Sequence, residues 1–256
     1  MCSSGAFCRF PDLTDHRRIL SYGRELGIPL EVLIYPNWTL GAVADDIARF
    51  SLDIRAIHAD KDITARLAAG DSLGFGLLER NVEFAVRLGA GLVVLHAWRA
   101  DGAGVARCLE ALPRCASIAA GGGVVLGLET VPCGSLPILP TVREAISRAG
   151  SCGVVLDTEF LARAGELDAA LASSWLWEGD RVIHVHAKDW SGSFDLDEGP
   201  RYLQPGDGLV DFPRLGRALT ESGFGGGLSL EASALDAAGH VDLDALRRSI
   251  EYLDSL

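Results

Sequence analysis

The sequence has 256 residues, 48% of them hydrophobic, which is enough to bury a full core in a single domain over residues 1–256. Lys and Arg number 23 against 35 Asp and Glu, so the formal net charge is -12 and we expect no nucleic-acid partner. No stretch approaches the roughly 20 uninterrupted apolar residues of a membrane span, so we expect no membrane association.

Short β-rich runs alternate with longer segments whose apolar residues recur at helical spacing, which is typical of repeated β-α units around a parallel sheet. The predicted strands are 5–10, 30–35, 54–58, 91–96, 123–129, 152–157, 181–186 and 227–231. The predicted helices are 16–27, 40–50, 74–89, 104–121, 140–150, 161–173, 212–223 and 242–253. Eight matched pairs favour a closed (β/α)8 TIM barrel, and an open doubly wound sheet is the alternative.

The segment 187–210 is the one long irregular stretch, between the seventh strand and its helix. A loop of this length in a compact domain is usually functional, and on a barrel it would lie over the mouth. The six cysteines form no CxxC pair and are interpreted as small core residues, which favours a reducing compartment. Because the N-terminal MCSSGAFCRF has neither a basic leader nor a long apolar segment, we expect a soluble cytoplasmic protein.

Four polar side chains stand at or next to the carboxyl ends of predicted strands: Glu129, Asp157, His186 and Glu231. Active sites of α/β barrels are built at this end of the strands. Buried carboxylates need a positive partner, and a divalent metal supplies one. Three carboxylates and one imidazole suit Mn²⁺, Mg²⁺ or Co²⁺, with Zn²⁺ as a further option. Each residue alone would be read as a helix cap or a surface group, but four equivalent positions favour a metal site.

Further side chains near the strand ends are candidates for substrate binding. His58 and His96 end the third and fourth strands and are interpreted as substrate contacts, with a second-metal ligand or a satisfied polar residue as alternatives. Lys188 would polarise a substrate oxygen or form a salt bridge between loops. Trp98 would stack on the apolar face of a sugar, and Arg201 is a candidate for binding an anion. Trp175 and Trp177, predicted at the opposite end of the barrel, would suit a homodimer contact.

The segments LGLET, VVLDTEF, HVHAKDW, PGDGLVDF and LSLEAS resemble those of the sugar isomerase and epimerase superfamily of xylose isomerase-like TIM barrels, to which the endonuclease IV type also belongs. The resemblance spans most of the chain from IHAD onward. It implies a single divalent metal on Glu129, Asp157, His186 and Glu231. Glu129 and Glu231 would also act as acid and base. The implied reaction removes a proton next to the carbonyl of a small polyhydroxy substrate, through a metal-stabilised enediolate.

One departure from the family pattern concerns the substrate. Members commonly carry a histidine three residues after the aspartate of the sixth strand, where this chain has Phe160. The resemblance to the endonuclease branch rests on His58, His96 and Glu129, but the further ligands of its trinuclear centre are missing at Phe160 and around Arg201. Phosphodiester cleavage is therefore disfavoured. Two more functions remain compatible with the sequence: a dehydratase or lyase acting on a keto-polyol, and a non-catalytic metal-binding barrel.

Overall fold

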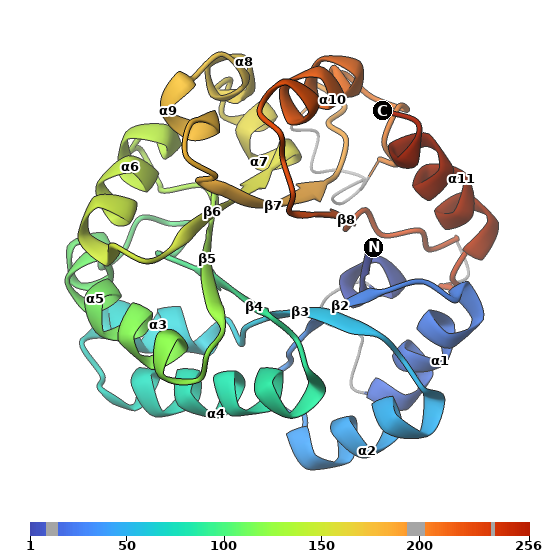
Figure 1. Ribbon diagram of the computed structural model, residues 1–256, viewed down its shortest axis with the longest axis horizontal. Coiled ribbons are helices and arrows are strands. Elements are labelled where there is room, and N and C mark those ends of the chain that lie inside the picture. The colour runs from blue at the N-terminus through green and yellow to red at the C-terminus, as the bar shows by residue number, and fades with distance from the viewer. Residues whose placement is uncertain (9–14, 194–202, 237–238) are drawn as a thin grey trace.

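The computed structural model describes residues 1–8, 15–193, 203–236 and 239–256. Eight parallel strands close into a barrel in sequence order, and helices surround it (Figure 1). The strands are β1 (Cys2–Ser3), β2 (Leu30–Leu33), β3 (Ile54–His58), β4 (Leu92–His96), β5 (Val125–Glu129), β6 (Gly153–Asp157), β7 (Val182–Ala187) and β8 (Gly227–Leu230). The predicted (β/α)8 TIM barrel is confirmed, and closure of β8 onto β1 rules out the open sheet.

The helices follow the predicted segments, with three differences. They are α1 (His16–Leu26), α2 (Leu40–Phe50), α3 (Asp62–Ala69), α4 (Leu73–Leu88), α5 (Val105–Gly121), α6 (Ile138–Ala149), α7 (Thr158–Arg163), α8 (Leu167–Leu171), α9 (Ser174–Trp177), α10 (Phe212–Glu221) and α11 (Leu243–Asp254). Neither α3 nor α9 was predicted. The predicted helix 161–173 is split, because Gly165 adopts the left-handed conformation (φ 69°) between α7 and α8.

The predicted first strand at 5–10 is wrong. The strand is Cys2–Ser3, and Ser4–Phe7 form a short 3-10 helix, η1. The Ser3 side chain accepts the backbone N–H of Gly5 and so caps this turn, which carries Ala6 and Phe7 into the core. Residues 9 and 10 lie outside the described residues. The apolar pattern therefore marked a buried segment correctly but assigned it the wrong backbone conformation.

Close packing inside the barrel depends on two glycines in the strands. A Cβ on Gly127 would lie 2.5 Å from a methyl carbon of Val155, and one on Gly153 would lie 2.5 Å from the side chain of Ile183. Such distances are too short for carbon atoms, so a larger residue at either position would displace its neighbour. The glycines make room for branched side chains where β5, β6 and β7 pair below the mouth.

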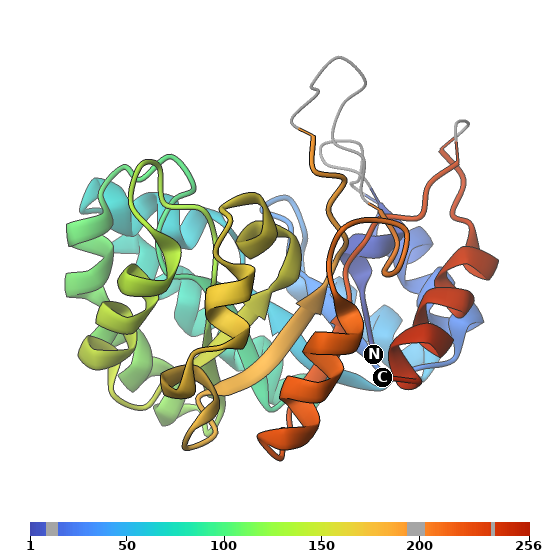
Figure 2. The same cartoon turned by 90° about the horizontal axis from the view of Figure 1, so that it is seen from above.

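The mouth of the barrel is the end at which the strands finish and the longer connections begin, as the side view in Figure 2 shows. The six cysteines form no disulfide; five are buried and Cys152 is partly buried. Among the helices of the described residues, none combines the length and apolarity needed to cross a bilayer.

Candidate active site

The four residues predicted at the strand ends lie together at the mouth. Glu129 and Asp157 end β5 and β6, His186 lies one residue before the end of β7, and Glu231 directly follows β8. One ligand atom of each lies within 4.8 Å of the others. Glu129, Asp157 and His186 are buried, and the side chain of Glu231 is 12% exposed. The carboxyl ends of the parallel strands meet at one rim, which is why residues distant in sequence converge here.

His186 lies at the centre of the cluster. Its Nδ1 atom is 2.7 Å from Glu129 Oε1, 3.4 Å from Glu231 Oε2 and 3.9 Å from Asp157 Oδ2. This nitrogen therefore faces all three carboxylates. One imidazole nitrogen together with several carboxylate oxygens is a donor set that a hard or borderline divalent cation prefers.

Lys188 supplies a positive charge to the same cluster. Its Nζ atom lies 2.6 Å from Asp157 Oδ2 and 2.7 Å from Glu231 Oε2. The ammonium also lies 4.5 Å from the centre of the Phe160 ring, a cation–π distance. Lys188 was predicted either to contact substrate or to form a salt bridge, and the structure shows it in ion pairs. Lys188 also lines the cavity described below.

His58 and His96 both contact Glu129. The Nε2 atoms of His58 and His96 lie 3.2 Å and 2.6 Å from Glu129 Oε2. His58 is buried, whereas the His96 side chain is 18% exposed. With His186 on Oε1, Glu129 thus has three imidazole neighbours from three other strands.

Glu31, which was not predicted as a site residue, completes the buried network. Glu31, on β2, is fully buried, and its two carboxylate oxygens contact two histidines of β7. Its Oε2 lies 2.8 Å from His184 Nε2 and its Oε1 lies 3.0 Å from His186 Nε2. The signal in the sequence was a single acid within the apolar run LEVLIY, since a buried acid needs a partner.

The charges of the cluster follow from these contacts. Burial alone would raise the pKa of Glu129 and of Glu231. The neighbouring imidazoles, and at Glu231 also Lys188, outweigh this effect, so the pKa of both glutamates lies below its usual range. Burial raises the pKa of Asp157 to about 7, although Lys188 partly opposes this. The two glutamates are therefore carboxylates at neutral pH.

The residues present fit a divalent metal. Three carboxylates and the Nδ1 atom of His186 form the donor set, and one atom of each lies within 4.8 Å of the others. Asp157 Oδ2 is buried and lies 2.6 Å from Lys188 Nζ, and a cation bound here would be a second positive partner for it. The donor set is rich in oxygen, which favours Mn²⁺, Mg²⁺ or Co²⁺ over metals that prefer sulfur ligands.

A cavity of about 150 Å³ opens beside the cluster. Its wall brings together acids, imidazoles and aromatic rings from several strands and from α7. The lining residues are Gly5, Cys8, Leu33, Tyr35, His58, Lys61, His96, Glu129, Glu159, Phe160, Arg163, Lys188, Glu231 and Ser233. This volume is below the roughly 300–1,000 Å³ of pockets for drug-sized ligands, so the cavity favours a small molecule.

The remaining residues considered for substrate binding do not all lie at the cavity. Trp98 is fully buried, donates its indole N–H to the carbonyl of Val131 and does not line the cavity. Arg201 lies outside the described residues. Phe160, where the resemblance implies a histidine, lines the cavity, and so does Tyr35, which was not predicted as a site residue.

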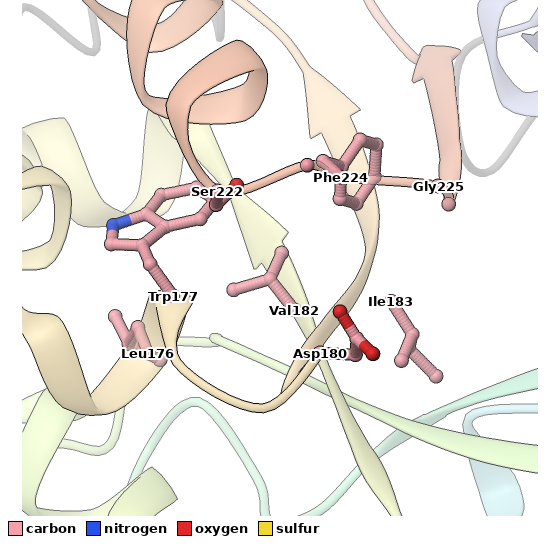
Figure 3. A pocket seen from close by; sticks show the side chains of 10 residues that line it. Leu176, Trp177, Asp180, Val182, Ile183, Ser222, Phe224 and Gly225 are labelled. Atoms are coloured by element: carbon pink, nitrogen blue, oxygen red, sulfur yellow. The ribbon is translucent and has the colours of Figure 1, made fainter.

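A second cavity, of about 450 Å³, lies at the start of β7 and β8 (Figure 3). Leu176, Trp177, Val182 and Phe224 give it a largely apolar wall, and Asp180 is the one charged side chain among the described residues that line it. It lies away from the carboxyl ends of the strands and contains none of the groups of the cluster. The smaller cavity at the mouth is therefore the candidate active site, although the other is larger.

The glycine-rich PGDG turn is organised by Asp189. Its Oδ2 accepts the backbone N–H groups of Gly206 and Gly208, at 2.9 and 2.8 Å, and its Oδ1 accepts that of Val210 at 2.9 Å. Backbone N–H groups that could hold a phosphate are thus bound to a carboxylate of the same chain. The PGDG segment is a turn anchored to the connection that follows β7.

Replacing Asp189 with Ala is expected to destabilise the protein by about 3 kcal/mol, because several N–H groups lose a charged acceptor. Urea unfolding would measure the change. Asp207→Ala is the matched control, since Asp207 lies exposed in the same turn and should alter the free energy of unfolding by less than about 0.5 kcal/mol. Equal effects of the two substitutions would show that the Asp189 contacts do not anchor the turn.

The closed parallel barrel has the architecture of a TIM-barrel protein. Its cluster of acids and histidines lies at the carboxyl ends of the strands, where the active sites of this fold are found. The chain belongs to the xylose isomerase-like TIM barrel family, whose model matches residues 18–256. This confirms the resemblance identified from the sequence.

Solved structures share the fold at low sequence identity. A D-allulose 3-epimerase from Methylomonas sp., in complex with D-allulose, has a TM-score of 0.71 at 16% identity, covering 99% of this chain and 95% of that chain. A 3-keto-D-glucoside 4-epimerase from E. coli has a TM-score of 0.69 at 18% identity, covering 100% and 98%. A D-psicose 3-epimerase with D-tagatose from Clostridium cellulolyticum H10 has a TM-score of 0.67 at 15% identity, covering 95% and 94%. Comparison with curated proteins finds no match.

Proposed function

We propose that this protein is a divalent-metal-dependent epimerase or isomerase of a small polyhydroxy ketone or aldehyde, or of its phosphate. The observation that carries the proposal is that Glu129 and Glu231, from different strands, both line one small cavity and both belong to a cluster suited to a cation. Two carboxylates beside one substrate position are what proton removal and return require.

The cation would be held by Glu129, Asp157, His186 and Glu231, and Mn²⁺, Mg²⁺ or Co²⁺ suits these donors. When bound, it would supply positive charge beside the carbonyl oxygen of the substrate, which makes the hydrogen on the adjacent carbon more acidic.

Glu231 is the better placed of the two glutamates to take the first proton. Its lowered pKa keeps it a carboxylate at neutral pH, and its side chain is partly exposed to the cavity. Glu129 is more enclosed, since three imidazoles surround its two oxygens. Return of a proton to the opposite face of the same carbon gives an epimer, and return to the neighbouring carbon gives an isomer.

The cavity wall offers groups that would orient a sugar. Lys188, His58 and His96 would bind its oxygens, and the rings of Phe160 and Tyr35 would contact its carbon–hydrogen faces. A divalent cation on Asp157 and Glu231 would repel the Lys188 ammonium from these carboxylates and favour its contact with substrate.

The experiment that tests the function uses the purified protein with Mn²⁺ in heavy water. The substrates are D-allulose, D-tagatose and a 3-keto-glucoside, the sugars for which the structurally similar proteins are named or with which they were solved. We expect deuterium at the carbon next to the carbonyl and a new epimer or isomer, both detected by NMR. The protein without added metal, treated with a chelator, is the control.

Different outcomes of this experiment would indicate different functions. A product that absorbs in the ultraviolet would indicate loss of a β-hydroxyl, and therefore a dehydratase or lyase that shares the first proton abstraction. Metal binding without deuterium incorporation into any sugar of a broad ketose and aldose panel would contradict the proposed function and favour a non-catalytic barrel.

A further inference from the structure

The two nitrogens of His186 face different environments. Nδ1 points to the carboxylates of Glu129, Asp157 and Glu231, whereas Nε2 points to the opposite side, toward Glu31. His186 and Glu31 are both 0% exposed, so water does not compete for this contact. Each nitrogen has a carboxylate partner, Glu129 at Nδ1 (2.7 Å) and Glu31 at Nε2 (3.0 Å). A metal bound at Nδ1 would require the lone pair of that nitrogen, which leaves the proton of a neutral imidazole on Nε2, facing Glu31.

Glu31 is fixed on both of its oxygens. Oε1 lies 3.0 Å from His186 Nε2, and Oε2 lies 2.8 Å from His184 Nε2. His184 and His186 alternate with Val185 on β7, so both imidazoles point to the inside of the barrel, where β2 brings Glu31. A carboxylate that accepts a hydrogen bond at each oxygen has little freedom to rotate.

We propose that Glu31 is a positioning residue that holds the proton of His186 on Nε2 and so presents the Nδ1 lone pair to the metal. This inference rests on the proposed metal site and names a role for a residue that does not itself contact metal or substrate. His184 acts on Glu31 from the other side and limits its rotation. A metal-bound imidazole whose second nitrogen is hydrogen-bonded to a carboxylate is a better-oriented and more basic ligand.

The test compares Mn²⁺ binding by isothermal titration calorimetry in the whole protein and in three variants. Glu31→Gln preserves the shape of the side chain but removes its charge and one of its two acceptor oxygens, so we expect affinity for Mn²⁺ to fall by about 10- to 100-fold. His184→Gln keeps a donor for Glu31 and should change the affinity much less. Asp46→Asn is the matched control.

Asp46 is a buried acid on α2 that pairs with His16 and Arg17, remote from the cluster. Its replacement should lower stability while leaving the Mn²⁺ affinity unchanged. A folded Glu31→Gln variant with wild-type affinity would overturn the proposal. Equal losses in the Glu31 and His184 variants would also overturn it, because they would indicate a packing role only.

A second measurement does not depend on metal. In metal-free protein labelled with ¹⁵N-histidine, NMR should show a hydrogen-bonded Nε2–H on His186, assigned by its absence in His186→Gln and lost or shifted in Glu31→Gln. Absence of that proton in the wild type would refute the role of Glu31. Presence of the proton in a protein that binds no Mn²⁺ would instead refute the proposed metal-dependent function and leave the positioning of His186 standing.

Discussion

Replacing Glu231 with Gln is expected to lower the rate of epimerisation, and of proton exchange at the substrate carbon, by about 10²- to 10⁴-fold. The amide cannot accept a proton at neutral pH, whereas the Glu231 carboxylate, with its lowered pKa, can. The amide oxygen remains a metal ligand, so metal content should stay near that of the wild type. Deuterium incorporation from heavy water measures the exchange, and elemental analysis measures the metal.

The control for this substitution is Glu159→Gln. Glu159 lines the same cavity but pairs with Arg163 at the rim and lies outside the cluster. Its replacement should leave most of the exchange rate intact. If the Glu231 variant exchanged deuterium as fast as the wild type while retaining its metal, the acid–base role of Glu231 would be wrong.

Removal of the metal is expected to abolish activity and to lower the melting temperature by about 5 to 10 °C. A ligand at 100 times its Kd stabilises the folded state by about 2.7 kcal/mol. In a chain of this size each kcal/mol shifts the melting temperature by about 2 to 4 °C. Dialysis against a chelator followed by differential scanning calorimetry, with and without Mn²⁺, makes the measurement.

An Asp157→Ala variant, which has no side-chain oxygen to bind a metal, serves as the internal control for metal removal. Asp157 is fully buried and would contribute one ligand, so its variant should show a much smaller response to added Mn²⁺. An identical response in both proteins would place the bound metal elsewhere in the molecule. No response in the wild type would end the case for a metal at the mouth.

The fold could be predicted from the sequence because each strand is an apolar run and each helix has its own apolar face. The end of the first strand could not, since Ala6 and Phe7 are as apolar as strand residues but occupy a turn capped by Ser3. The break between α7 and α8 depends on the left-handed conformation of Gly165, which the helical apolar pattern concealed.

The candidate site could be predicted to the extent that it lies at the strand ends. Glu129, Asp157, His186 and Glu231 were selected as potential metal ligands at the ends of predicted strands, and the structure brings them together. Glu31 was overlooked because it belongs to a strand with no polar residue at its end, and its partners lie across the barrel. Trp98 was selected for its place after a strand, but side-chain direction, which the sequence does not give, turns it into the core.

The contacts of Glu129 link the packing of the barrel to its proposed chemistry. Its two oxygens meet imidazoles from β3, β4 and β7, so one side chain ties four strands together across the rim, its own included. The same contacts thus join these strands and assemble the proposed catalytic groups, so we expect substitution of Glu129 to lower both stability and activity. Glu231, bound to fewer strands, separates chemistry from folding more cleanly.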